Sequence, residues 1–384
     1  MTKTIPWQPA LFALVTLAVT ALTFTNPGTS DVSDFLSWSA TLLQKNPFAG
    51  YALIADYPPL GPFILWAAAW LGHAVHIPPL ATLKLAIAVF QYAAAFIAWR
   101  VFSPHAATLL FCLIAAYGSL LGYIDCFYLP IILLGLLALS HQRPAVALLL
   151  FTAATLIKWQ PAILCPIILL QGFAIAQGPQ KFLFPLPAAA FAAAVILAFA
   201  PASVWWAFSG ATSDPFFSGQ AFNLDWLTTG LMKLFHIAGQ HFTPDGTITP
   251  IIALPPPWYA ASRTAFWAIY LANLALFALR AKTPKRLIFA LLAAQSIQFT
   301  LNTGVHENHA FLILVLGFVA LFQDHISKLR FALIAFLALS NILLFYGFPA
   351  ANLTGGYYGA TLTITLSAVQ CALCIATIHS HIAA

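Results

Sequence analysis

The acidic residues of this chain are few enough to be considered one at a time. Nine Asp and Glu residues stand among 384. Asp31 and Asp34 lie three residues apart, so in a helix they would share a face. A carboxylate placed in this way can accept a proton from an attacking hydroxyl. Taken alone, each also suits a solvated or helix-capping role, and Ser30 and Asp31 would cap a helix over 32–43.

Asp56 begins the sequence Asp-Tyr-Pro-Pro-Leu, which ends at Leu60. Its two prolines lack amide donors and hold the chain extended before the next apolar segment. A structural role is therefore expected for Asp56 and Tyr57, whatever their chemistry.

Lys158 interrupts an apolar stretch in the sequence Lys-Trp-Gln-Pro, and Asp125 follows Gly122 in another. A lysine at the end of an apolar segment can extend its ammonium group to the membrane interface, or it can bind an anion such as a phosphate. The local sequence does not choose between these two interpretations.

A third polar group is His306-Glu307-Asn308-His309, at the end of an apolar segment. The histidine spacing suits two metal ligands on one helical face, but only Glu307 is near as a third, so no metal and no other cofactor is expected. Hydrogen bonding to a phosphate is favoured, and an interfacial helix cap stays open.

The composition determines the class of protein to which these residues belong. Hydrophobic residues make up 62% of the chain and charged residues 6%, with a mean hydropathy of +0.91. A soluble domain carries roughly a quarter charged residues. We predict an all-α polytopic membrane protein, a single domain over 1–384 with about 12–13 transmembrane segments. The candidate segments are 9–25, 60–75, 83–99, 106–122, 126–140, 144–157, 161–176, 183–201, 259–279, 287–301, 309–322, 330–346 and 359–378.

Basic residues lie mainly in the short loops between these segments. The net charge of +6 could suggest a nucleic-acid partner, but this loop pattern is the positive-inside rule, so none is expected. It places two long loops, 26–59 and 202–258, on the outer side, together with Asp125 and Lys158. Eight of the nine acids, Asp214 and Asp245 included, would then face outward, and Asp324 inward. The alternation fails between residues 60 and 125, which predicts one re-entrant or broken segment there.

These motifs, in this order, resemble the GT-C superfamily of membrane glycosyltransferases. Asp31 stands seven residues before Trp38, Asp-Tyr-Pro-Pro-Leu follows, and His306-Glu307-Asn308-His309 comes late in the chain. The closest resemblance is to the dolichyl-phosphate-glucose-dependent glucosyltransferases that extend lipid-linked oligosaccharides. The chain is also similar to bacterial polyprenyl-phosphate-sugar-dependent relatives in Asp125, in Lys158 with Gln160, and in the sequence from Gln220 through Asn223 to Trp226. Asn308 stands where the glucosyltransferases have lysine.

The resemblance implies an inverting transfer of a hexose, such as glucose or mannose, from a polyprenyl-phosphate sugar to a glycan or lipid-linked acceptor. It implies Asp31 as the catalytic base, with Lys158 and His306 at the departing phosphate. The other residues that it assigns to substrate binding are Asp34, Asp56, Tyr57, Asp125, Gln160, Asn223, Glu307 and His309. The short loops favour a bacterial inner-membrane protein with a periplasmic site.

Two other classes of function remain open. A flippase or transporter of lipid-linked substrates would carry polar groups at the middle of its spans, where this sequence has few. A membrane scaffold without catalytic activity would leave the shared occurrence of the outer motifs unexplained.

Overall fold

The computed structural model describes residues 7–54, 56–213, 216–219, 221–234, 251–253, 256–280, 282–348, 353–354 and 360–384. Asp214, Gln220 and Asp245 lie outside these residues, as does the stretch 235–250 of the predicted outer loop 202–258. The predicted single domain divides into two compact units, Met1–Gly210 and Ala211–Ala384.

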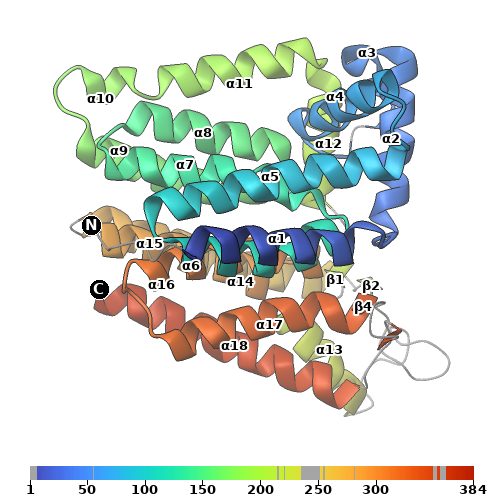
Figure 1. Cartoon of the computed structure of the whole chain (residues 1–384). Coiled ribbons are helices and arrows are strands. Elements are labelled where there is room, and N and C mark those ends of the chain that lie inside the picture. The colour runs from blue at the N-terminus through green and yellow to red at the C-terminus, as the bar shows by residue number, and fades with distance from the viewer. Residues whose placement is uncertain are drawn as a thin grey trace. The chain divides into compact units, whose positions relative to one another are not determined.

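Unit 1 consists of helices in the described residues (Figure 1). The predicted helix over 32–43 is found as α2, although the Ser30 side chain makes no capping hydrogen bond to it. In chain order the elements are α1 (Gln8–Phe24), α2 (Asp31–Lys45), α3 (Pro47–Tyr51), α4 (Leu60–Ala74), α5 (Pro79–Val101), α6 (Pro104–Ala115), the π-helix η1 (Ala116–Leu120), the 3₁₀ helix η2 (Ile124–Phe127), α7 (Leu129–Ser140), α8 (Pro144–Ile157), the 3₁₀ helix η3 (Gln160–Leu164), α9 (Cys165–Ile175), α10 (Gln180–Leu183), α11 (Leu186–Ala198) and α12 (Pro201–Ser213).

Proline marks the start of many of these helices. Because proline has no amide hydrogen and a fixed φ angle, it fits the first helical turn, where amides have no intrahelical partner. Proline occupies this turn in α5, α6, α7, α8, α9 and α11. The Ser103 side chain also accepts a hydrogen bond from the Ala106 amide and caps α6. The sequence therefore divides its apolar stretches into separate helices by local signals alone.

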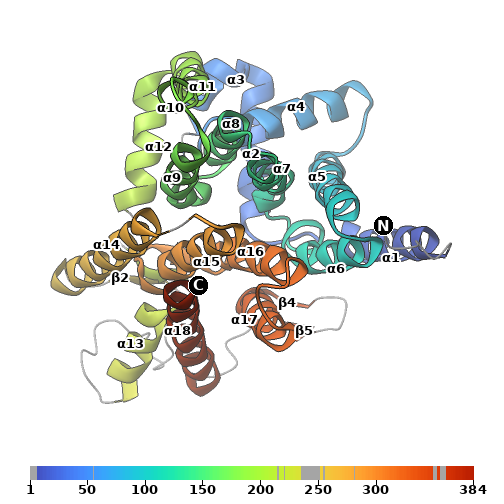
Figure 2. The same ribbon diagram turned by 90° about the vertical axis from the view of Figure 1, so that its left-hand side faces the viewer.

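Helix α4 explains why the predicted alternation fails between residues 60 and 125. In Figures 1 and 2, α2 and α4 run across the ends of α5, α7 and α8 instead of alongside them. At one end of α4, Gly61 packs against the Ile157 carbonyl at the end of α8, and at the other, Gly72 packs against Thr82 near the start of α5. The predicted span 60–75 is thus a helix that lies across its neighbours. Without it, α1, α5, α6, α7, α8, α9 and α11 alternate in direction.

Unit 1 has a polar end and a basic end. The polar end, where α8 finishes and α5 and α7 begin, carries Asp31, Asp125 and Lys158. The basic end, where α5, α7 and α9 finish, carries Arg100, Arg143 and Lys181. The basic end also brings the starts of α1 and α6 together, because the Gln8 Nε2 lies 3.1 Å from the His105 Nε2.

Unit 2 combines helices with short strands. Its elements are β1 (Phe216–Gly219), α13 (Leu224–Leu234), β2 (Ile251–Ala253), α14 (Pro256–Leu279), α15 (Pro284–Leu301), β3 (Val305–His306), the 3₁₀ helix η5 (Glu307–Ala310), α16 (Phe311–Phe322), α17 (Lys328–Tyr346), β4 (Gly347–Phe348), β5 (Leu353–Thr354) and α18 (Ala360–Ala383). Strand β1 pairs antiparallel with β2 and parallel with β3, and β4 pairs antiparallel with β5. Helices α15 and α16 form the buried core of the unit.

The lengths and composition of the helices bear out an all-α integral membrane protein. Five helical stretches of the described residues are long and apolar enough to cross a membrane: Pro79–Val101, Gln180–Ala198, Tyr259–Leu279, Lys328–Tyr346 and Leu362–Ala383. Further apolar helices, among them Gln8–Phe24 and Pro144–Ile157, are shorter. Each of the thirteen predicted segments overlaps a helix of the described residues, although α4 does not run along its neighbours. The predicted outer loop 202–258 also contains most of α12 and, in unit 2, the helix Leu224–Leu234.

Candidate active site

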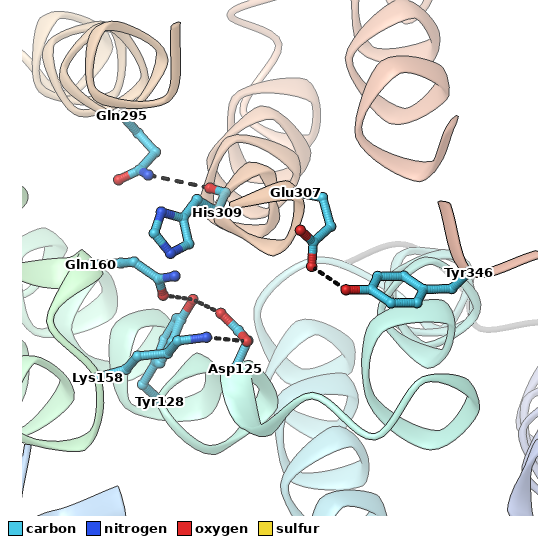
Figure 3. A network of polar contacts seen from close by, with 8 residues as sticks. All are labelled: Asp125, Tyr128, Lys158, Gln160, Gln295, Glu307, His309 and Tyr346. Carbon is cyan, nitrogen blue, oxygen red and sulfur yellow. Dashed lines mark hydrogen bonds and ion pairs between the residues drawn. The ribbon is translucent and has the colours of Figure 1, made fainter. Parts of the chain in front are cut away.

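A buried ion pair lies at the polar end of unit 1. The Lys158 Nζ donates to the Asp125 Oδ2 at 2.6 Å, and the two residues are 5% and 0% exposed. The Tyr128 hydroxyl donates to the Asp125 Oδ1 at 3.0 Å, with the Gln160 Oε1 3.4 Å away (Figure 3). Burial lowers the pKa of Lys158, but Asp125, Tyr57 and Asp31 together more than offset this, and the net pKa is raised. Lys158 is therefore cationic, and part of its charge is already balanced by the protein.

Tyr57 forms the wall beside this pair. The Lys158 Nζ lies 5.5 Å from the centre of the Tyr57 ring, a cation–π distance. The Tyr57 ring also packs edge-on against Trp38, and the Tyr51 hydroxyl donates to the Tyr57 carbonyl at 2.7 Å. Burial raises the pKa of Tyr57 to about 12, so its hydroxyl stays protonated at neutral pH. The rigid Asp-Tyr-Pro-Pro segment thus directs an aromatic ring and a hydroxyl donor toward Lys158.

Asp31 and Asp34 differ in their neighbours, although they lie on the same helix. Asp31 opens α2 and is half-buried, and its charge acts on both Tyr57 and Lys158. Asp34 is exposed, and its charge acts on Asp56. Partial loss of hydration, together with the Asp34 charge, raises the pKa of Asp56. Asp31 therefore belongs to the Lys158 cluster, whereas Asp34 and Asp56 form an acidic pair beside it.

Two glycines bring the start of α2 to the loop that carries Asp125. Gly28 and Gly122 have φ angles of +85° and +83°, in the left-handed region that favours glycine. The Val32 side chain fills the space where a Cβ atom of either glycine would lie. The Thr29 amide donates to the Leu121 carbonyl at 2.9 Å and ties the two loops together. This junction positions Asp31 beside the Asp125 loop.

A buried lysine, Lys84, binds the chain just before the same loop. The Lys84 Nζ, on α5, donates to the carbonyls of Ser119 and Leu120 at 2.7 and 3.1 Å. These carbonyls belong to the last turn of η1, where a cation is favoured by the helix dipole. Lys84 is fully buried. It holds the chain just before Gly122 and Asp125, and sequence reasoning did not single it out.

The late His-Glu-Asn-His group lies in unit 2. His306 belongs to β3, and its ring packs against Gly219 of the neighbouring strand β1 so closely that a Cβ atom at Gly219 would collide with it. The His306 and His309 ring centres are 5.7 Å apart. The Tyr346 hydroxyl donates to the Glu307 Oε1 at 2.9 Å, and the Gln295 Nε2 to the His309 carbonyl at 3.4 Å (Figure 3). These contacts hold both histidine rings, half-buried, near the start of α16.

Asn223 has a structural task in unit 2. Its Oδ1 accepts a hydrogen bond from the Trp226 amide at 2.9 Å, so it caps the start of α13. The side chain is fully buried, and its Nδ2 finds no partner among the described residues. Gln160 in unit 1 is similar, because its Nε2 is buried without a partner in that part of the chain. Both side chains keep a donor available.

Unit 1 brings six of the predicted site residues into one region: Asp31, Asp34, Asp56, Tyr57, Asp125 and Lys158, with Gln160 reached through Tyr128. Unit 2 gathers His306, Glu307 and His309, and places Asn223 at the start of α13. Sequence reasoning missed Tyr128, Lys84 and the pair of glycines. Gly-Tyr-Ile-Asp, which places a glycine three residues before Asp125, was the signal that could have indicated a special backbone conformation there.

Among the described residues, no group of three or more His, Cys, Asp or Glu side chains is arranged to hold a metal ion. Glu307 is engaged by Tyr346, and the acids of unit 1 pair with Lys158 or with one another. The polar end offers a carboxylate, an ammonium group and a phenol, those of Asp125, Lys158 and Tyr128, which contact one another and are buried. No protein-family model matches the chain, and no curated protein shows significant similarity to it.

Proposed function

We propose that this protein is an inverting glycosyltransferase that uses a polyprenyl-phosphate sugar as its donor. The observation that carries the proposal is the gathering of Asp31, Tyr57, Asp125 and Lys158 at one end of a set of apolar helices. A membrane-embedded donor presents its sugar and phosphate at the membrane surface, where such an end would meet them. The order of the motifs along the chain adds the resemblance to the GT-C superfamily.

In the proposed reaction Asp31 accepts the proton of the acceptor hydroxyl as its oxygen attacks the anomeric carbon of the donor. A new C–O bond forms on one face of the sugar while the bond to the phosphate breaks on the other. The polyprenyl phosphate leaves with the bonding electron pair. Lys158 and Tyr57 of unit 1 supply the positive charge and a hydrogen-bond donor that stabilise the charge developing on that phosphate. The resemblance assigns the same role to His306 of unit 2.

The remaining assigned residues bind substrate in this proposal. Asp34 and Asp56 offer acceptors for sugar hydroxyls, and the buried Gln160 and Asn223 offer donors. Asp125 keeps Lys158 charged. Glu307 and His309 of unit 2 are assigned to substrate binding by the resemblance. The polar end is proposed to face the periplasm of a bacterial inner membrane, because Arg100, Arg143 and Lys181 lie at the basic end and would be cytoplasmic.

Contacts inside the spans argue against the transporter alternative. Lys84 and Gln91 lie within the apolar helix α5, but both donate to backbone carbonyls, Gln91 to that of Ile114 at 3.0 Å. Asn273 in unit 2 donates to the Ala290 carbonyl at 3.3 Å. Polar groups bound in this way stabilise helix packing. Their donor groups are therefore already engaged by the protein's own backbone.

The proposal is tested by incubating the purified protein with a panel of polyprenyl-phosphate sugars and a membrane lipid extract as the acceptor source. Mass spectrometry would identify the sugar donor that is consumed and the glycan product that appears. Asp31→Asn, which keeps the shape of the side chain, serves as the matched inactive control. The proposal fails if no donor is consumed, or if Asp31→Asn consumes it equally fast.

A further inference from the structure

A groove lies at the basic end of unit 1, away from the candidate active site. It encloses about 400 Å³ and is lined by Arg143 and Val146 of the α8 start, Ala176 after α9, and Gln180, Leu183 and Phe184 of the α10 region. Helix α8 runs from this groove to Lys158, which at 1.5 Å per residue separates groove and ion pair by about 20 Å. The volume lies within the range of small-molecule sites.

The walls of the groove are apolar, and they continue into exposed apolar surface. Phe182 and Leu183 of α10 are 80% and 57% exposed, and Leu186 at the start of α11 is 56% exposed. In an integral membrane protein, side chains of this kind contact the hydrocarbon of the bilayer. Gly172 of α9 packs directly against Phe184 and Pro144, two residues that line the groove. We therefore expect the groove to open toward lipid.

The charge at the mouth of the groove has one sign. Arg143 lines the groove, and Lys181 lies beside Gln180 on α10; both side chains are exposed. The acidic residues of the first 210 are Asp31, Asp34, Asp56 and Asp125, and all of them belong to the polar end. Helix α8 begins at the groove with no side-chain cap, so the positive end of its dipole adds to the field of the two cations.

We propose that this groove binds an anionic phospholipid, with acyl-chain carbons against Val146, Leu183 and Phe184 and the phosphate held by Arg143. Guanidinium groups bind phosphate oxygens through two parallel hydrogen bonds. Basic pockets between membrane helices bind anionic headgroups in the same way. The lipid would hold together the ends of α8, α9 and α10, which are separated in sequence. The inference does not depend on the proposed transferase activity.

The test uses delipidated full-length protein in mild detergent and two lipids with identical acyl chains, phosphatidylglycerol and phosphatidylcholine. Native mass spectrometry measures the number of lipids retained and their affinities. We expect one phosphatidylglycerol to bind at least about tenfold more tightly than phosphatidylcholine, because phosphatidylglycerol carries a net negative charge and phosphatidylcholine carries none. Glycerol phosphate, the headgroup without chains, should not compete at the same concentration.

Two variants separate the charge from the cavity. Arg143→Gln should remove the preference for phosphatidylglycerol, and Val146→Trp, at a 45% exposed position, should fill the groove and weaken binding of both lipids. Arg100→Gln is the matched control, since Arg100 also lies at the basic end, on α5, and does not line the groove. Equal affinity for the two lipids in the unmodified protein would overturn the proposal. It would also be overturned if Val146→Trp bound phosphatidylglycerol with unchanged affinity. The same holds if Arg100→Gln lost the preference for phosphatidylglycerol as fully as Arg143→Gln.

Discussion

From the Asp125–Lys158 pair we predict how substitutions change the free energy of unfolding, with no substrate present. Asp125→Asn would leave a buried ammonium group without its counter-ion, and Lys158→Met would leave a buried carboxylate. Breaking a buried pair from one side typically costs about 3–5 kcal/mol of unfolding free energy. Replacing both partners in the double variant should recover most of that loss, because no unpaired charge stays buried.

The pH dependence sharpens the prediction. In each single variant the unpaired buried group can avoid the cost of a buried charge by becoming neutral. At pH 7 this change of protonation costs about 4 kcal/mol for a carboxylate of pKa about 3.9 and about 5 kcal/mol for an ammonium of pKa about 10.4. In Asp125→Asn the unfolded chain then binds more protons than the folded one, so stability should rise with pH between 6 and 8. In Lys158→Met the folded chain binds more protons, so stability should fall. Each slope approaches about 1.4 kcal/mol per pH unit.

The assay is unfolding of the purified protein in mixed micelles, followed by tryptophan fluorescence at pH 6, 7 and 8. The unmodified protein should show little slope from Lys158, because its raised pKa keeps the ammonium group charged in the folded state over that range. Asp34→Asn, an exposed change at the same end, should cost under about 1 kcal/mol. Slopes of the same sign in the two single variants, or a loss below 1 kcal/mol in both, would refute the assignment of a buried, charged pair.

Four further predictions concern the proposed reaction. Asp31→Asn should lower turnover by about a hundred-fold or more with expression nearly unchanged, and Asp34→Asn much less; the reverse pattern in steady-state assays would move the base one turn along α2. Lys158→Ala and His306→Ala should each weaken use of the donor by roughly ten- to a hundred-fold, the loss expected for one charged hydrogen bond; donor titrations unchanged in both would remove the two residues from the phosphate. A UDP- or GDP-sugar should not serve as donor, which rapid turnover with either in protein free of donor synthases would contradict. Exhaustive chelation should leave transfer intact, and loss of activity that one added metal restores would disprove this.

The sequence by itself was sufficient for the class of protein and for the positions of the long apolar helices, but not for α12 and α13, which fall largely within the predicted outer loop 202–258. Apolar composition and proline placement are local signals, so each predicted segment overlaps a helix through its apolar length and, in α5 to α9 and α11, through a proline in the first turn. The order of Asp31, Asp56, Asp125 and Lys158 along the chain was also visible in the sequence. Their grouping at one end of unit 1 followed once the helices alternated in direction.

Only the tertiary structure decided the direction of α4 and the partners of the charged residues. A helix of fifteen residues has the same local signals whether it runs along its neighbours or across them, and the contacts of Gly61 and Gly72 with distant helices set its direction. The ion pair joins residues 33 positions apart, and Lys84 reaches carbonyls 35 and 36 positions away. Hydrophobic periodicity carries no information about such pairings, because they depend on which buried polar groups must satisfy one another after the helices have packed.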